Sequence, residues 1–168
     1  MIAAHESALL RSTVYGVLAH AFHAPADVTD DQVECGASAA TLLCELLERA
    51  GATASADAAR RLAGTAPSAN ASRRMFGHTP ESAVPAYETQ YGNDTLFGQP
   101  RELSDIGAFV AAFGLTVDPA RHERVDHVSC ECELMCFLAA KEAYALEHRD
   151  DAMRSVVADA EKRFLREH

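Results

Sequence analysis

Residues 121–148 read RHERVDHVSCECELMCFLAAKEAYALEH, and this stretch decides the fold. Its second half carries seven consecutive apolar residues, from Leu134 to Ala140. Because a helix that is apolar on every side has to be surrounded by other helices, we expect a central core helix here. The first half is dense in ionisable side chains, which are costly to bury unless each finds a partner. Charged residues therefore directly precede the core-forming residues at this point of the chain.

Amphipathic helices are predicted on both sides of this stretch, from apolar residues spaced i, i+3, i+4. The expected helices cover residues 3–24, 29–51 with Thr29 as cap and Gly51 as stop, 55–62, 80–91 with a bend at Pro85, 103–113 with Gly114 as stop, and 153–164. Asp118 and Pro119 are expected to cap the long core helix. Residues 64–78 have no periodicity and are predicted to form a surface loop. The fold class is therefore all-α, a single-domain bundle of six or seven helices over residues 1–168.

The composition limits the possible partners and compartments. The 168 residues suit one domain, and with 48% hydrophobic and 24% charged residues the chain should be an ordinary soluble protein. No run approaches the roughly 18 apolar residues of a membrane span, and the N-terminus does not resemble a signal peptide. We therefore expect a cytoplasmic protein without stable membrane insertion. A net charge of −10 argues against nucleic acid and favours a basic partner.

The residue types that usually carry catalysis or bind metals do not occur here at the spacings typical of such sites. His127 and Glu131 are spaced i, i+4, as are Cys132 and Cys136, but the two pairs lie on different helix faces. Glu131 and Glu133 diverge by about 200° around a helix and cannot act on one substrate together. We therefore expect no catalytic residue, no metal and no cofactor.

Two alternatives remain open at this point. One is a small metal-binding or redox-sensing protein that uses His127, Glu131 and the cysteines, and the other is a helical enzyme with carboxylate chemistry. The odd number of cysteines and the lack of an export signal favour reduced thiols over a disulfide framework. The five cysteines are Cys35, Cys44, Cys130, Cys132 and Cys136.

Three segments together resemble the TorD/DmsD/NarJ family of molybdoenzyme assembly chaperones. They are PAYETQYG (residues 85–92), LSDIGAFVAAFGL (residues 103–115) and ERVDHVSCECELMCFLAAKEA (residues 123–143). The resemblance is closest to the chaperones of ethylbenzene, dimethyl sulfide, selenate and nitrate enzymes. It implies an all-helical protein without catalytic turnover. Such a protein binds the catalytic subunit of a molybdopterin-dependent oxidoreductase in the cytoplasm, often through its twin-arginine leader, until the cofactor is inserted.

The resemblance also indicates where the partner binds. A leader has an arginine pair followed by an apolar stretch, so its receptor needs carboxylates beside an apolar groove. The family's tyrosine-glutamate and aspartate-histidine motifs fall on residues 87–88 and 126–127. The candidate partner-binding residues are Tyr87, Glu88, Tyr91, Phe109, Asp126, His127, Glu131 and Glu133, and Leu96, Phe97 and Phe113 would complete the groove.

A structural role stays open for the same motif residues. Tyr87 could be core packing, and His127 could be a histidine satisfied at a helix start. Glu88 and Asp126 could instead pair with Arg124 or Arg11 and fix the arrangement of the helices, because buried ion pairs serve the specificity of a fold as readily as function.

Two features depart from the family pattern. The chain contains no tryptophan, although relatives often place one near the groove. It also stops at FLREH, where relatives commonly continue into a further helix. We expect that helix to be missing, truncated or supplied by a second molecule, which would form a homodimer by helix exchange.

Overall fold

The computed structural model describes residues 3–23, 30–63, 75–76, 84–91, 98–119 and 123–168, with the side chains of residues 30–38 and 98 left aside. Within these ranges the chain forms α-helices and no strand, so the all-α prediction is confirmed. The elements are α1 (Ala4–Phe22), α2 (Asp30–Arg49), α3 (Thr53–Ala63), the 3₁₀ turn η1 (Glu88–Gln90), α5 (Gly98–Ala112), α6 (Val128–His148) and α7 (Asp151–Glu167).

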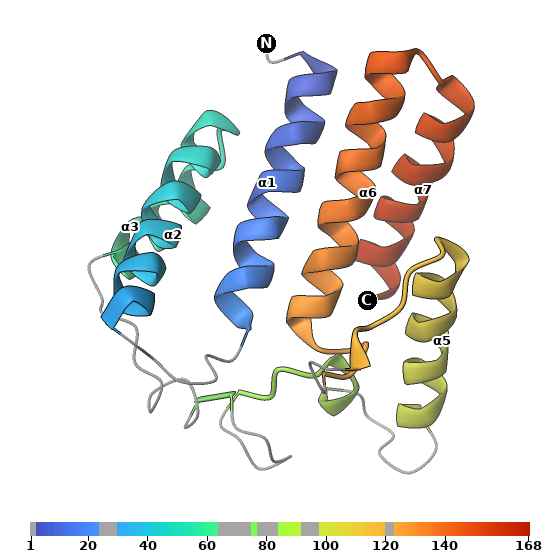
Figure 1. Ribbon diagram of the computed structural model, residues 1–168, viewed down its shortest axis with the longest axis horizontal. Coiled ribbons are helices and arrows are strands. Elements are labelled where there is room, and N and C mark those ends of the chain that lie inside the picture. Colours follow the sequence, from blue (N-terminus) through green and yellow to red (C-terminus); the bar gives the residue numbers. More distant parts are fainter. Residues whose placement is uncertain (1–2, 24–29, 64–74, 77–83, 92–97, 120–122) are drawn as a thin grey trace.

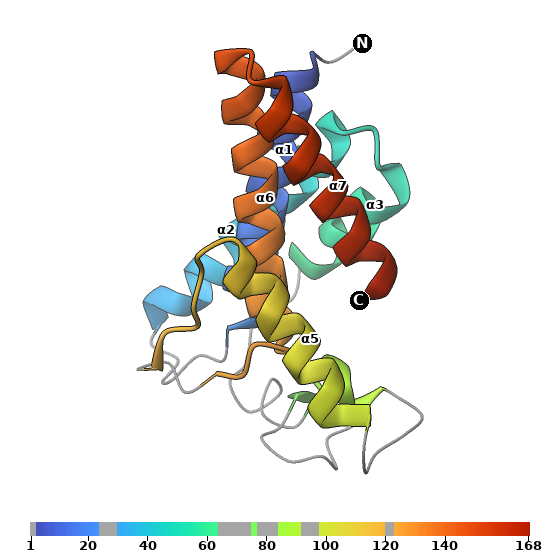
Figure 2. The same cartoon turned by 90° about the vertical axis from the view of Figure 1, so that its right-hand side faces the viewer.

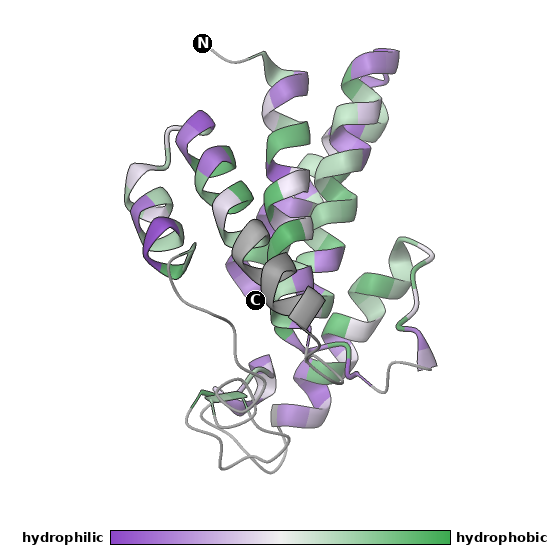
Figure 3. Ribbon diagram, turned by 60° about the vertical axis from the view of Figure 1, so that its left-hand side comes forward, coloured by the Kyte–Doolittle hydropathy of each residue, from purple (hydrophilic) through white to green (hydrophobic). Residues whose placement is uncertain are grey.

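Helix α6 lies at the centre of the bundle. Helix α1 packs along one side of it and α7 along another, while α2 and α3 form a hairpin beyond α1 (Figure 1). Helix α5 lies near the lower halves of α6 and α7, as the second view shows (Figure 2). Hydrophobic residues are frequent along α1 and α6, where polar residues interrupt them (Figure 3). None of the described helices is long and apolar enough to cross a membrane.

The main core confirms the prediction of a central helix. Leu134, Met135 and Leu138 of α6 meet buried residues of α5 and α7, with Leu138 fully buried. Ala140 is exposed, so the all-round apolar run of α6 still leaves a narrow face open to solvent. The buried partners from the other two helices are Ile106, Val157 and Phe164.

An ion-pair network joins α1, α6 and α7. The Arg11 guanidinium of α1 reaches Glu142 of α6 and bonds Glu161 of α7, its Nε lying 3.0 Å from Glu161 Oε1. Glu161 is buried, so removing its partner would leave a costly unpaired charge in the bundle. Arg11 is therefore engaged with Glu142 and Glu161, and the considered pairing of Arg11 with Glu88 or Asp126 is not observed.

The predicted helix over residues 80–91 is wrong in its described part. Residues 84–87 lack helical structure and only Glu88–Gln90 form a 3₁₀ turn. Pro85 has no amide proton and disfavours helical geometry before it. The neighbouring backbone groups find non-local partners: Val128 N donates to Ala86 O and Glu88 N donates to Asp126 O, each at 2.9 Å.

The predicted cap of the long helix at Asp118 and Pro119 is also wrong. Helix α6 begins at Val128, and its N-cap is His127, with extended backbone angles φ −78° and ψ 134°. The His127 ring accepts a hydrogen bond from Ser129 N at 3.2 Å. The helix starts late because residues 126–128 pair with residues 86–88 instead of continuing a helical turn.

The turn between α6 and α7 follows the predicted break near His148. Arg149 adopts a left-handed conformation (φ 55°), and Asp150 N-caps α7 by accepting from Met153 N at 2.9 Å. Asp150→Ala is therefore expected to lower the free energy of unfolding by about 1 kcal/mol. Urea denaturation measures this, and Asp150→Ser, which keeps an acceptor, should retain most of the stability. Equal losses in both variants would contradict the capping role.

Candidate partner-binding site

A short backbone clip holds residues 86–88 against residues 126–128. Tyr87 and His127 form an isolated antiparallel bridge. Their rings meet edge to face with centroids 5.1 Å apart, and the Arg124 guanidinium lies 4.9 Å from the centre of the Tyr87 ring. The tyrosine-glutamate and aspartate-histidine motifs, separate in the sequence, thus become one structural unit.

Asp126 stabilises the clip through side-chain hydrogen bonds. Its side chain is fully buried, and Oδ2 accepts from Thr89 Oγ1 at 2.7 Å and from Arg124 Nη2 at 2.8 Å. Arg124 Nη2 also donates to Thr89 Oγ1 at 2.9 Å. A buried carboxylate with two charge-strengthened hydrogen bonds holds its neighbours firmly. In this conformation Asp126 is not accessible to a partner. Its role is to position the residues of the clip.

His127 is also buried, with 5% of its surface exposed. Burial lowers the pKa of His127 below its ordinary value of 6.5, while the nearby Glu123 opposes this shift. Because Nδ1 accepts from Ser129 N, it carries no proton in this arrangement, and the proton of the neutral ring sits on Nε2. Nε2 faces Glu123 Oε2 at 3.9 Å. The observed role of this histidine is that of a helix cap.

Glu88 and Glu131 form a carboxyl pair beside the clip. Burial, followed by the neighbouring Glu88, raises the pKa of Glu131 to about 8. Glu88 Oε2 and Glu131 Oε1 are buried and receive no hydrogen bond. A protonated Glu131 suits this position, because a second buried carboxylate beside Glu88 would be repelled by it. The other Glu88 oxygen, Oε1, lies 2.9 Å from His168 Nδ1.

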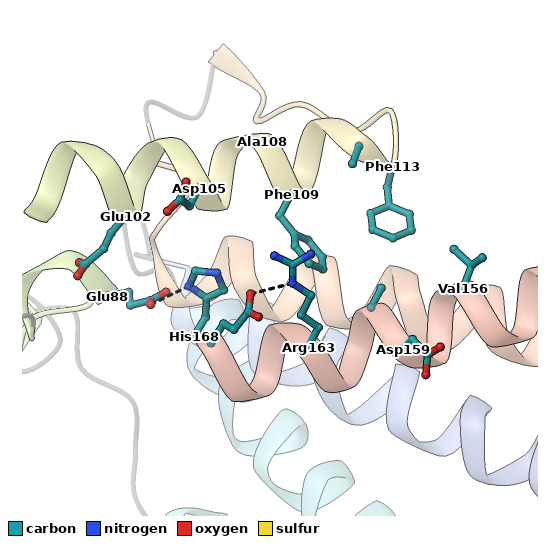
Figure 4. Close-up of a pocket in the computed structure, with 13 residues that line it drawn as sticks. Glu88, Glu102, Asp105, Ala108, Phe109, Phe113, Val156, Asp159, Arg163 and His168 are labelled. Atoms are coloured by element: carbon teal, nitrogen blue, oxygen red, sulfur yellow. Dashed lines mark hydrogen bonds and ion pairs between the residues drawn. The ribbon is translucent and has the colours of Figure 1, made fainter.

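Glu88 opens into a surface cleft of about 730 Å³ between α5 and α7 (Figure 4). Its apolar residues include Phe109, Phe113 and Val156, and Val156 is 61% exposed. Carboxylates outnumber basic groups around it, which suits a basic and partly apolar ligand. The charged lining residues are Glu88, Glu102, Asp105, Asp159, Arg163, Glu167 and His168.

Three carboxylates lie at one end of the cleft, while aromatic and apolar side chains lie toward the other end, together with Asp159. Figure 4 shows Glu102 and Asp105 on α5 near Glu88, with Phe113 and Val156 further along. Residues 102, 105 and 109 recur at helical spacing and so share one face of α5. A bound segment with a cationic start and an apolar continuation would match this order.

The structure brings together most, but not all, of the residues predicted from sequence. Glu88 and Phe109 line the cleft. Tyr87, Asp126 and His127 belong to the clip, and Glu131 lies near Glu88, but none of these four residues lines the cleft. Tyr91 is exposed, and its hydroxyl donates to Pro85 O at 2.7 Å. Glu133 lies apart and contacts His23 Nε2 at 3.0 Å. Leu96 and Phe97 lie outside the described residues.

Several cleft residues were missed by sequence reasoning. Glu102 and Asp105 precede Phe109 on one face of α5, a pattern that could have revealed them. Those of α7 were hidden because the apolar pattern of that helix was assigned wholly to the core. The missed residues are Glu102, Asp105, Asp159, Arg163, Glu167 and His168.

The partly buried thiols Cys130 and Cys132 of α6 have raised pKa values. Burial, followed by neighbouring acidic groups, raises the pKa of both Cys130 and Cys132 to about 11. Thiols with so high a pKa form little of the reactive thiolate at neutral pH. Among the described residues no three His, Cys, Asp or Glu side chains gather in a way that could hold a metal ion. Neither observation supports the metal or redox alternative.

The helices and the cleft define the class of the protein: a helical bundle with an acidic, apolar-floored surface cleft. A family model described as the nitrate reductase delta subunit matches residues 37–168, which is well over half of the chain. The chain belongs to this family, the NarJ/TorD-type assembly chaperones of molybdoenzymes, and the family predicted from sequence is confirmed. The searches of curated proteins and of solved structures returned no match.

Proposed function

We propose that this protein is a cytoplasmic chaperone that binds the twin-arginine leader of a molybdoenzyme catalytic subunit in the α5–α7 cleft. Binding would hold the subunit for molybdopterin insertion and keep its leader from export. The observation that carries the proposal is the polarity of the cleft, with Glu88, Glu102 and Asp105 near one end and Phe109, Phe113 and Val156 further along. Family membership supports the kind of partner.

Charge and shape explain why a leader suits this cleft. Its arginine pair would reach Glu102, Asp105 and Glu88, since guanidinium groups bind carboxylates through directed, charge-assisted hydrogen bonds. The apolar stretch that follows would lie on the aromatic surface of α5 as an amphipathic helix in a groove. Exposed carboxylates make part of this attraction sensitive to salt.

Val156→Lys is expected to weaken binding of a leader peptide about tenfold or more. The substitution removes an apolar contact and places a cation where the apolar stretch of the leader would lie, which is costly. Isothermal titration calorimetry at low and moderate salt measures the dissociation constant.

Leu165→Lys is the matched control. Leu165 is on the same helix and is 59% exposed, close to the 61% of Val156, but it does not line this cleft. It should leave leader binding unchanged. Equal effects of the two substitutions would place the contact elsewhere, and no binding of several leaders to the wild-type protein would overturn the proposed function.

A further inference from the structure

The last turn of α7 reaches across the cleft to α5 and η1. His168 Nδ1 contacts Glu88 Oε1 at 2.9 Å, its ring packs on Phe164 with centroids 4.7 Å apart, and its side chain is only 10% exposed. A ring nitrogen that faces a carboxylate carries a proton and donates it. The carboxylate nearest the clip is therefore occupied by a donor from the protein itself.

Arg163 makes a second contact of this kind one turn earlier. Its guanidinium carbon lies 6.0 Å from the centre of the Phe109 ring, at the limit of a cation–π contact. Its Nε donates to Glu167 Oε2 at 2.8 Å, which holds the side chain on this side of α7. Figure 4 shows His168 and Arg163 both pointing from α7 toward α5.

We propose that the end of α7, from Arg163 to His168, is a latch: the His168 and Arg163 side chains are an internal substitute for the ligand, which an incoming arginine-bearing segment must displace. The proposal rests on the proposed function and names the regulation of that same site. A carboxylate and an aromatic face are the two features that a guanidinium of a bound segment would use. Here one is taken by His168 and the other by Arg163, so the latch and the ligand compete for the same groups.

The contacts of the latch suit such an exchange. His168 makes one hydrogen bond to Glu88, and Arg163 makes one contact with the Phe109 ring. Opening breaks one hydrogen bond to Glu88, the packing of the His168 ring on Phe164, and one partly exposed cation–π contact. When only a fraction of the protein is open, the apparent affinity falls to that fraction of its intrinsic value. The latch therefore lowers the apparent affinity for the segment without preventing its binding.

The experiment compares leader binding by the wild-type protein, His168→Ala, Arg163→Gln and the double variant. Each single substitution should tighten binding about fivefold, because it removes one contact of the closed state. Arg166→Gln is the control, since it removes the same charge from an exposed position of the same helix end that does not line the cleft. It should leave the affinity within about twofold of wild type.

The outcomes separate the two proposals. Binding by the wild-type protein that the variants do not improve would overturn the latch and leave the proposed function standing. Absence of binding in every protein would overturn both, whereas binding only in the His168 and Arg163 variants would support both. As a second measurement, the imidazole NMR signal missing from His168→Ala should shift in the wild-type protein when the peptide is added, and an unmoved signal would contradict displacement.

Discussion

Asp126→Ala is expected to lower the free energy of unfolding by about 2–3 kcal/mol, because it leaves the buried Thr89 hydroxyl without its acceptor and the half-exposed Arg124 without its ion pair. The substitution leaves Thr89 Oγ1 and Arg124 Nη2 without their acceptor at 2.7 Å and 2.8 Å. It also empties a position that is fully buried. The clip between residues 86–88 and 126–128 should loosen, and Glu88 would then lose its place at the cleft.

Urea denaturation followed by circular dichroism measures this loss. Asp126→Asn keeps an oxygen that can accept both hydrogen bonds, so it should cost clearly less than the alanine variant. Asp159→Ala removes a carboxylate from an exposed position and should change stability by less than about 0.5 kcal/mol. If Asp126→Ala were no more destabilising than Asp159→Ala, the network would not hold the clip.

The same variants separate two roles for the motif. A residue that positions Glu88 should weaken leader binding only as far as the clip is disturbed, so Asp126→Asn should bind nearly as wild type. A residue that itself contacts the leader would lose binding in both variants with the fold intact. The buried position of Asp126 favours the first outcome.

The helices were predictable because they follow a local period. The apolar run of α6, the glycine after α5 and the break near His148 each depend on residues a few positions apart. Gly114 has φ 72°, a conformation that glycine adopts without strain, and it follows α5 as predicted. The resemblance to a family then supplied the two motifs.

The start of α6 and the segment before it were not predictable from periodicity. The bond from Val128 N to Ala86 O joins residues 42 positions apart, and a non-local pair of this kind leaves no repeating pattern. It replaces helical bonds that the sequence alone would allow. The contact of Glu88 with His168 spans 80 positions and was hidden for the same reason.

Helix α7 shows a different limit. Its apolar positions were all assigned to the core, and Val157 and Phe164 are indeed buried there. Val156 follows the same spacing but lies exposed in the cleft. Hydrophobic spacing identifies a helix face, yet it cannot tell a face covered by the protein from one that awaits a partner.

Glu131→Gln is expected to remove a decline in stability that the wild-type protein shows between about pH 5 and pH 8. Burial and the nearby Glu88 and Asp126 raise the pKa of Glu131 to about 8 from an ordinary value of 4.5. Between these values the folded protein keeps a proton that the unfolded chain has released. Because the folded state binds more protons, its free energy of unfolding falls as the pH rises, and the fall ends above the folded pKa.

The full shift would correspond to about 1.4 kcal/mol for each pH unit. Glu131 is partly exposed, so solvent screening reduces the total to a decline on the order of 2 kcal/mol. Glutamine keeps a donor toward Glu88 and does not titrate, so the stability of the variant relative to the wild type should increase steadily up to pH 8.

Urea denaturation at unit pH steps from 5 to 9 measures the difference. Glu147→Gln, at an exposed position of the same helix, should follow the wild-type curve. Parallel curves for wild type and Glu131→Gln would show that the carboxyl pair does not hold a proton in the folded protein.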